Sequence, residues 1–200
     1  MNLITFGDSH SWVGWKFSVP NLSILHGKNG PFTMARFGME KLNLLNIKNS
    51  SINDGDVNCF SFGEIDCRSH ICKPRNMKEH ITLIDDIVIR YFEAIKMNVD
   101  QFKNLTTMIL CVVPTPIKNN TIPNPEYPFE GTDNERKSVT LHMNLKLKEY
   151  CKKYNYVFLD VYDKYCDKDG YLNKELSDGH VHIKNGIYIQ EFLINFIKHE

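Results

Sequence analysis

The sequence has no surplus of charge of either sign. Lysine and arginine together number 24, aspartate and glutamate also number 24, and the formal net charge is zero. Proteins that bind nucleic acid normally carry a basic surplus that neutralises phosphates, so we expect no nucleic-acid partner. An acidic or basic tail that could serve as a charged interaction arm is also missing.

Long apolar runs are missing as well. No stretch is long and apolar enough to cross a bilayer, so we expect no membrane span. The opening segment, MNLITFGDSH, is too short an apolar run for a secretory signal and lacks a basic beginning. We therefore expect a cytoplasmic protein whose six cysteines stay reduced, with Cys59 and Cys111 as small core residues.

The sequence also lacks internal repeats, interdomain linkers and phosphate-binding loops. Neither a G-x-G-x-x-G nor a Walker-type loop follows the first apolar segment, which argues against a nucleotide-binding flavodoxin-like domain. A length of 200 residues suits one domain, and an apolar fraction of 42% is enough for a sizeable core. We expect a single domain over residues 1–200, and we assign it no cofactor.

The chain does contain short apolar runs that alternate with longer stretches of helical period. This alternation is typical of an α/β domain with a parallel sheet. The predicted strands, several of them apolar on both faces, are Leu3–Phe6, Leu22–Leu25, Val57–Phe62, Met108–Val113 and Tyr156–Val161. Apolar residues at three- and four-residue spacing predict helices within 81–102, 139–154 and 189–197. We expect a three-layer α/β/α sandwich with a parallel sheet of about five strands.

A proline-rich segment, residues 114–131, follows the fourth predicted strand. Its prolines exclude a helix and disfavour a central strand; they are Pro114, Pro116, Pro123, Pro125 and Pro128. A segment in this position lies at the carboxyl edge of the sheet, where open α/β folds bind ligands. Long ordered loops in such places are often functional.

A serine directly follows the first predicted strand, in Gly7-Asp8-Ser9-His10. A tight turn there presents the hydroxyl at the carboxyl edge of the sheet. It also directs the serine's own N–H into the site, where it can stabilise an oxyanion. Taken alone, Asp-Ser after a strand is equally an ordinary helix N-cap.

The segment Ser177-Asp178-Gly179-His180-Val181-His182 precedes the last predicted helix. A nucleophilic serine needs a base to take its proton, and the base needs a carboxylate that holds its tautomer. Asp178 and a nearby histidine supply both groups. Because this segment and Ser9 map to the same edge of the sheet, a Ser-His-Asp site is favoured over a pair of solvated histidines.

These segments resemble the sequence blocks of the SGNH (GDSL-like) hydrolase superfamily. Gly7-Asp8-Ser9 resembles the first block, and Asp178 with His182 resembles the last. The resemblance implies a serine esterase or O-acyltransferase in which Ser9 is the nucleophile, His182 the base and Asp178 the orienting carboxylate.

Two further segments resemble the intervening blocks in the correct order. Gly30, in Asn29-Gly30-Pro31, resembles the glycine whose N–H lines the oxyanion hole together with that of Ser9. Gly63-Glu64-Ile65-Asp66 corresponds to Gly-x-Asn-Asp, but Ile65 stands where the superfamily has its oxyanion-hole asparagine. Since isoleucine donates no hydrogen bond, we expect Arg68 to supply the missing donor.

The last block also departs from the superfamily pattern. His182 is four residues after Asp178, rather than three, and His180 is two residues after it. We favour His182 as the base because Ile183 resembles the apolar residue that follows the superfamily's catalytic histidine. His180 remains an alternative.

The longer string from Ser61 to Arg68 is similar to a subgroup of SGNH-like proteins associated with glycan biosynthesis, and Pro114, residues 131–136 and Asn144 fit the same pattern. This resemblance implies an acylated sugar or glycan substrate, with an acetyl ester expected. Three acidic residues are candidates for binding sugar hydroxyls: Asp8, Glu64 and Asp66. For Glu64 and Asp66 individually, a structural ion pair with Arg68 or Arg36 is favoured over sugar binding.

Two other interpretations are open. Cys67, His70 and Cys72 lie close together, but they lack the paired spacing that zinc sites show, and we assign no metal. The protein could also be a carbohydrate-binding module that lost its chemistry, since fold alone does not guarantee activity. The absence of the oxyanion-hole asparagine favours such a module, whereas the joint presence of serine, aspartate and histidine argues against it.

Overall fold

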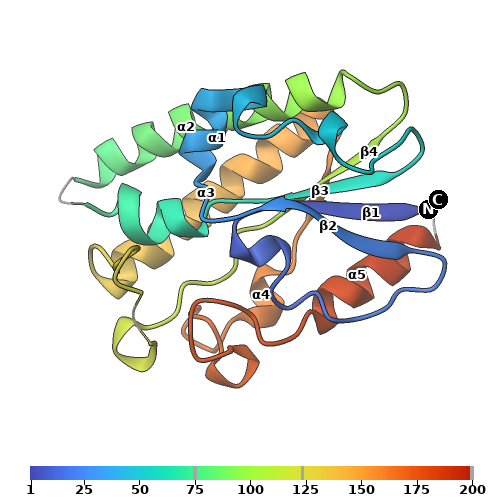
Figure 1. Cartoon of the computed structure of the whole chain (residues 1–200). Helices are drawn as coiled ribbons and strands as arrows, with labels where there is room; N and C mark the ends of the chain where they lie inside the picture. The colour runs from blue at the N-terminus through green and yellow to red at the C-terminus, as the bar shows by residue number, and fades with distance from the viewer. Residues whose placement is uncertain (74–75, 123, 199–200) are drawn as a thin grey trace.

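A computed structural model of the chain describes residues 1–73, 76–122 and 124–198, so Pro123 of the proline-rich segment lies outside the described residues. Within these ranges the strands are β1 (Asn2–Gly7), β2 (Ser23–Asn29), β3 (Val57–Ser61), β4 (Thr106–Leu110) and β5 (Val157–Leu159). The α-helices are α1 (Met34–Glu40), α2 (Met77–Val99), α3 (Asp133–Tyr154), α4 (Tyr162–Tyr165) and α5 (Ile187–Ile197) (Figure 1). Short helices are η1 (Ser9–Ser11), η2 (Lys41–Asn43), η3 (Ile47–Asn49), η5 (Lys118–Asn120) and η6 (Lys174–Leu176), with a π-helix, η4, at Asp66–Ile71.

The described strands form one five-stranded sheet in the order β2-β1-β3-β4-β5. Every pairing in it is parallel, which confirms the predicted fold class. The chain adds β2 on one side of β1 and the later strands on the other. Open α/β sheets bind ligands at such a switch point, beyond the carboxyl ends of the strands. Ser9 directly follows β1 and therefore lies at this point.

Helices cover both faces of the sheet, so the three-layer prediction is confirmed. Figure 1 shows α1, α2 and α3 on one side of the strands and α5 on the other. Alternate residues of β1 point to opposite faces, as the strand period requires. Ile4 and Phe6 join the core beneath α1, α2 and α3, whereas Leu3 joins the core beneath α4 and α5.

Two strand ends differ from the prediction by three residues or more. β2 continues to Asn29, because an edge strand can pair through polar residues such as His26 that interrupt the apolar run. β4 ends at Leu110, three residues early. Beyond it, the Val112 N–H donates to Asn144 Oδ1 of α3 (2.7 Å) and the Val112 carbonyl accepts from Asn144 Nδ2 (2.8 Å). A side chain thus replaces a neighbouring strand as the partner of this backbone.

Helix α1 was not predicted from the sequence. It is only seven residues long, and its first N–H groups depend on partners outside it. The Thr33 side chain caps the Arg36 N–H, and the distant Asp66 carboxylate accepts from the N–H groups of Met34 (2.7 Å) and Ala35 (3.1 Å). The start of the helix is therefore set by a residue more than thirty positions away.

The described helices include none with the length and apolar character that crossing a bilayer requires.

Candidate active site

The turn after β1 requires a glycine at its first position. Gly7 has a φ of +151°, and a Cβ placed on it would lie 1.8 Å from the carbonyl oxygen of Ser61 in β3. The Asp8 N–H donates to that carbonyl at 3.0 Å, so the chain stays against β3 until it turns. Ser9 then begins η1, which the Asp8 side chain caps by accepting from the His10 N–H (2.9 Å). One turn therefore contains both the capping Asp8 and a serine that lines the cavity described below.

Ser9, His182 and Asp178 are joined by two hydrogen bonds. His182 Nε2 lies 2.8 Å from Ser9 Oγ, and His182 Nδ1 lies 2.9 Å from Asp178 Oδ2. Since an ionised carboxylate only accepts, Nδ1 carries the proton and Nε2 is left to accept the serine hydroxyl proton. This is the relation among nucleophile, base and orienting carboxylate that serine hydrolysis requires.

The loop that carries Asp178 and His182 explains their unusual spacing. The Asp178 N–H donates to the His182 carbonyl at 3.1 Å, and Ser177 and Ile183 form an isolated antiparallel bridge. Gly179 occupies the left-handed region at φ +89° inside this closed turn. The closed turn places the side chains of Asp178 and His182, four residues apart, on the same side of the loop.

His180 has a different place in the same turn. Its N–H donates to Asp178 Oδ1 (2.8 Å) and its carbonyl accepts from Ser177 Oγ (3.3 Å). The residue is exposed at the rim of the cavity that contains Ser9. The hydrogen bond to Ser9 Oγ is made by His182, so the geometry favours His182 over His180 as the base.

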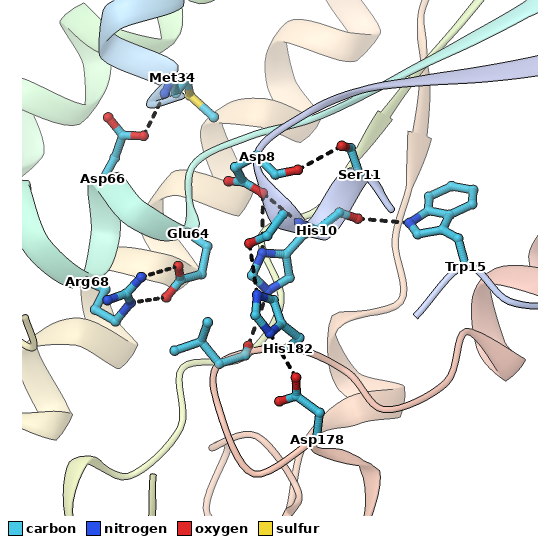
Figure 2. A network of polar contacts seen from close by, with 12 residues as sticks. Asp8, His10, Ser11, Trp15, Met34, Glu64, Asp66, Arg68, Asp178 and His182 are labelled. Atoms are coloured by element: carbon cyan, nitrogen blue, oxygen red, sulfur yellow. Dashed lines mark hydrogen bonds and ion pairs between the residues drawn. The ribbon is translucent and has the colours of Figure 1, made fainter. Parts of the chain in front are cut away.

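Burial and a neighbouring histidine lower the pKa of His182 below the ordinary histidine value. Burial is the largest cause, the charge of His10 adds to it, and the bond to Asp178 acts in the opposite direction. The rings of His10 and His182 have centroids 4.9 Å apart (Figure 2). A lowered pKa keeps the imidazole neutral, which is the form that accepts a proton, over a wider range of pH.

Ser9 and His182 open into a cavity of about 360 Å³. Its walls come from the η1 turn, the end of β2, the segment after β3, the proline-rich segment and the Asp178–His182 turn. The lining residues are Ser9, Trp12, Asn29, Gly30, Pro31, Ile65, Arg68, Ile122, Asn124, Glu126, Tyr127, His180, Val181 and His182. The proline-rich segment therefore lies at the carboxyl edge of the sheet, as predicted, and one wall of the cavity belongs to it.

The structure corrects the role expected of Gly30. Gly30 lines the cavity, but its N–H donates to the Gly7 carbonyl at 3.2 Å and so extends the pairing of β2 with β1. An N–H engaged in the sheet is not available as an oxyanion donor. The preceding residue, Asn29, also lines the cavity, and its side-chain Nδ2 donates to the Gly27 carbonyl at 3.3 Å. With two N–H groups on Nδ2, Asn29 keeps a further donor.

Asn29 is thus a candidate oxyanion donor that the sequence interpretation missed. The residue belongs to the Asn29-Gly30-Pro31 segment, in which only Gly30 was expected to donate. Ile65 occupies the wall where the expected asparagine is missing, and only 4% of its surface is exposed. In the sequence, the feature that indicates this donor is the amide side chain immediately before Gly30.

Arg68 forms a buried ion pair with Glu64. Its Nε lies 2.6 Å from Glu64 Oε1 and its Nη2 lies 3.0 Å from Glu64 Oε2, with both side chains at most 8% exposed. Arg68 Nη1 also donates to the Tyr127 carbonyl, and the Ser69 hydroxyl donates to the Pro128 carbonyl at 2.8 Å. The segment after β3 therefore holds the proline-rich wall in place. Glu64 is an internal ion-pair partner of Arg68, the structural role favoured for it above, and not a residue free to bind sugar.

Replacing Arg68 with glutamine is expected to lower the free energy of unfolding by about 3 kcal/mol, because it leaves the buried Glu64 carboxylate unpaired. The double variant Glu64→Gln/Arg68→Gln should regain most of this loss, as measured by urea denaturation. A single variant as stable as the wild type would contradict the ion-pair assignment.

The folded double variant also tests whether Arg68 is an oxyanion donor. If it is, turnover by this variant should fall about a hundredfold.

Asp8 and Asp66 also have internal partners. This corrects the assignment of Asp8 to sugar binding, and for Asp66 it gives the structural role favoured above, with backbone N–H groups of α1 as partners in place of an arginine. Asp8 is 1% exposed, and its Oδ1 accepts from the His10 N–H and faces His10 Nδ1 at 3.3 Å. Asp66 is fully buried and caps α1, as Figure 2 shows for its bond to Met34. Burial raises the pKa of Asp66 to about 6, against the two backbone N–H bonds that lower it.

The cysteine cluster of the sequence analysis lies in the η4 region. Burial raises the pKa of the Cys67 thiol well above its ordinary value and that of Cys72 to about 11. In the part of the chain that the structure describes, no group of three or more histidine, cysteine, aspartate or glutamate side chains is arranged to hold a metal ion.

Of the comparisons with known proteins, only the one with solved structures finds matches. No protein-family sequence model matches this chain, and no curated protein sequence matches it. Solved structures do match. A member of the lipolytic protein G-D-S-L family from Veillonella parvula aligns with a TM-score of 0.60 and 14% identity, over 98% of this chain and 96% of its own.

Two other structures give similar values. A GDSL-like lipase from Bacteroides thetaiotaomicron aligns with a TM-score of 0.63 and 13% identity, over 99% of this chain and 88% of its own. Phospholipase A1 from Streptomyces albidoflavus aligns with a TM-score of 0.57 and 10% identity, over 99% of this chain and 98% of its own. The chain therefore shares the fold of the G-D-S-L lipolytic proteins.

Proposed function

We propose that this protein is a serine esterase or O-acyltransferase that uses Ser9 as nucleophile, His182 as base and Asp178 as orienting carboxylate. The observation that carries the proposal is the 2.8 Å approach of His182 Nε2 to Ser9 Oγ, with Nδ1 held by Asp178. The likeness of the fold to G-D-S-L lipolytic proteins supports the same reaction class.

The proposed mechanism follows from these contacts. His182 takes the hydroxyl proton as Ser9 Oγ attacks the ester carbonyl, and Asp178 stabilises the imidazolium that forms. The Ser9 N–H holds the oxyanion, assisted by the Asn29 carboxamide or by Arg68. His182 then returns the proton to the leaving alkoxide. The acyl-enzyme is discharged by water in an esterase, or by an acceptor hydroxyl in a transferase.

An acylated sugar with a small acyl group is the proposed substrate. The resemblance to SGNH-like proteins of glycan biosynthesis supports it, as does the composition of the cavity wall. Trp12 is 47% exposed at the cavity, beside the polar side chains of Asn29, Asn124 and Glu126. An exposed aromatic ring with a few polar groups can bind a sugar through its apolar face and its hydroxyls.

A fluorophosphonate probe tests the reaction class. The probe should label the native protein once, and mass spectrometry should place the label on Ser9. Protein unfolded in urea is the matched control and should remain unlabelled, because the serine is activated only by its histidine. Absence of labelling in the native protein would contradict the proposal.

Two observations favour a second function, a glycan-binding module without catalysis. Ile65 replaces a donor that the superfamily uses, and the Gly30 N–H is engaged with Gly7. Native protein that resists the probe but binds acetylated oligosaccharides in calorimetry would establish this alternative. Labelling of Ser9 together with turnover of p-nitrophenyl acetate would exclude it.

A further inference from the structure

A second aspartate–histidine pair lies against the proposed base. His10 follows Ser9 directly and is only 5% exposed. Its Nδ1 lies 3.3 Å from Asp8 Oδ1, and its Nε2 lies 3.2 Å from the Val181 carbonyl oxygen. Figure 2 shows the His10 ring between Asp8 and His182. The His10 carbonyl also accepts from Trp15 Nε1 at 2.8 Å, so the backbone of this residue is held as well.

The partners of His10 determine its protonation. A backbone carbonyl only accepts, and so does an ionised carboxylate. Both ring nitrogens of His10 therefore have to donate, and only the imidazolium form carries a proton on each. A neutral ring would leave one of the two buried contacts without a proton between its atoms.

We propose that His10 is a protonated positioning residue, which holds the His182 turn through Val181 and places a positive charge beside the proposed base. The inference deepens the proposed function, because His182 is the base of that mechanism. His10 itself has no contact with Ser9 Oγ in this role: its two ring nitrogens face Asp8 and Val181.

The electrostatics of the pair agree with this assignment. Burial lowers the pKa of His10, but the bond and charge of Asp8 and the charge of Glu64 outweigh it, so the pKa is raised. For His182 the direction is opposite: burial and then the charge of His10 lower its pKa, against Asp178 and Glu64. The charge of Glu64 is itself offset by Arg68. The pKa of one histidine is therefore raised and that of its neighbour lowered.

This arrangement has a consequence for the reaction. A base with a lowered pKa stays neutral at mildly acidic pH, so activity extends further to the acid side. Once His182 has accepted the serine proton, the adjacent positive charge makes it a stronger acid toward the leaving group. Loss of the His10 charge should raise the pKa of His182 and weaken both effects, while the contribution of burial remains.

The test compares wild type with His10→Gln by NMR, and it needs no substrate. Glutamine keeps one N–H donor for the Val181 carbonyl but carries no charge, so the turn is held while the cation is removed. The ¹H and ¹³C signals of the His182 ring, assigned with a His182→Gln variant, are followed against pH. We expect the His182 titration to move to higher pH in His10→Gln. The surface variant His142→Gln, whose ring faces Asp85 at 3.4 Å, is the control and should leave it unchanged.

An unchanged His182 titration in folded His10→Gln would overturn the proposal. If that variant does not fold, ¹⁵N shifts of the wild-type His10 ring still decide: protonation of both nitrogens at pH 7.5 supports the proposal, and one unprotonated nitrogen overturns it. Once a substrate ester is turned over, kcat/KM at pH 5.5 relative to pH 8 should be about threefold lower in the variant. Since NMR does not depend on turnover, failure of the proposed function is distinguishable from failure of this inference.

Discussion

Replacing Ser9 with alanine is expected to reduce kcat/KM for p-nitrophenyl acetate by about 10⁴-fold or more. The alanine removes Oγ, to which His182 Nε2 is hydrogen-bonded at 2.8 Å, and no acyl-enzyme can then form. The effect should appear in kcat, because the loss affects the chemical step, and the remaining rate should equal that of oxyanion stabilisation and binding alone.

The stability of the Ser9→Ala protein separates a chemical loss from a folding loss. The hydroxyl makes one described hydrogen bond to a half-buried ring, so the free energy of unfolding should change by less than about 1.5 kcal/mol. Ser18→Ala, an exposed serine of the same connecting segment, is the matched control and should retain full activity. More than a tenth of the wild-type activity in folded Ser9→Ala would remove this serine from the mechanism.

The second large effect is expected at His182, in comparison with His180. His182→Gln should reduce kcat/KM by about 10⁴-fold or more, because glutamine cannot take up and return a proton. His180→Gln should stay within about tenfold of wild type, since its bonds in the turn use the backbone N–H and carbonyl, which remain. Initial rates with p-nitrophenyl acetate over pH 5–9 measure both variants.

The comparison is informative because both histidines line one cavity and belong to one turn. A general disturbance of the turn would lower the activity of both variants alike. Equal losses would therefore contradict the assignment of one base, and a larger loss in His180→Gln would reverse it. Circular dichroism and thermal unfolding of the two proteins provide the control for folding.

Much of the fold follows from local pattern. The alternation of apolar runs and amphipathic stretches predicted all five strands of the described sheet and its three long helices. Helices α2 and α3 also begin with capping boxes, at Asn76 with Glu79 and at Thr132 with Glu135. Such elements depend on residues that are neighbours in the sequence. They can therefore be predicted from the spacing of apolar residues and from capping residues.

Elements that depend on distant partners were missed or misplaced. Helix α1 begins where the Asp66 carboxylate accepts its first N–H groups, and β4 ends where Asn144 replaces a strand. Hydrogen bonds to internal partners also changed the candidate site. The acidic residues expected to bind sugar are occupied by internal partners, and Gly30 is engaged in the sheet. The partners of Asp66, Val112 and Gly30 lie more than twenty residues away in the sequence, whereas those of Asp8 and Glu64 lie within four residues.

The sequence by itself determined the parallel α/β architecture, the position of Ser9 after the first strand and the candidate base and carboxylate before the last helix. These follow from hydrophobic periodicity and from the order of elements along the chain. Only the tertiary structure decided that His182 rather than His180 approaches Ser9, that Arg68 pairs with Glu64, and that His10 lies against His182. The contacts of His182 with Ser9 and of His182 with His10 join residues more than 170 positions apart, and such distances are set by packing. The Arg68–Glu64 pair is local, but its burial and its choice over a free donor follow from the need to satisfy buried polar groups.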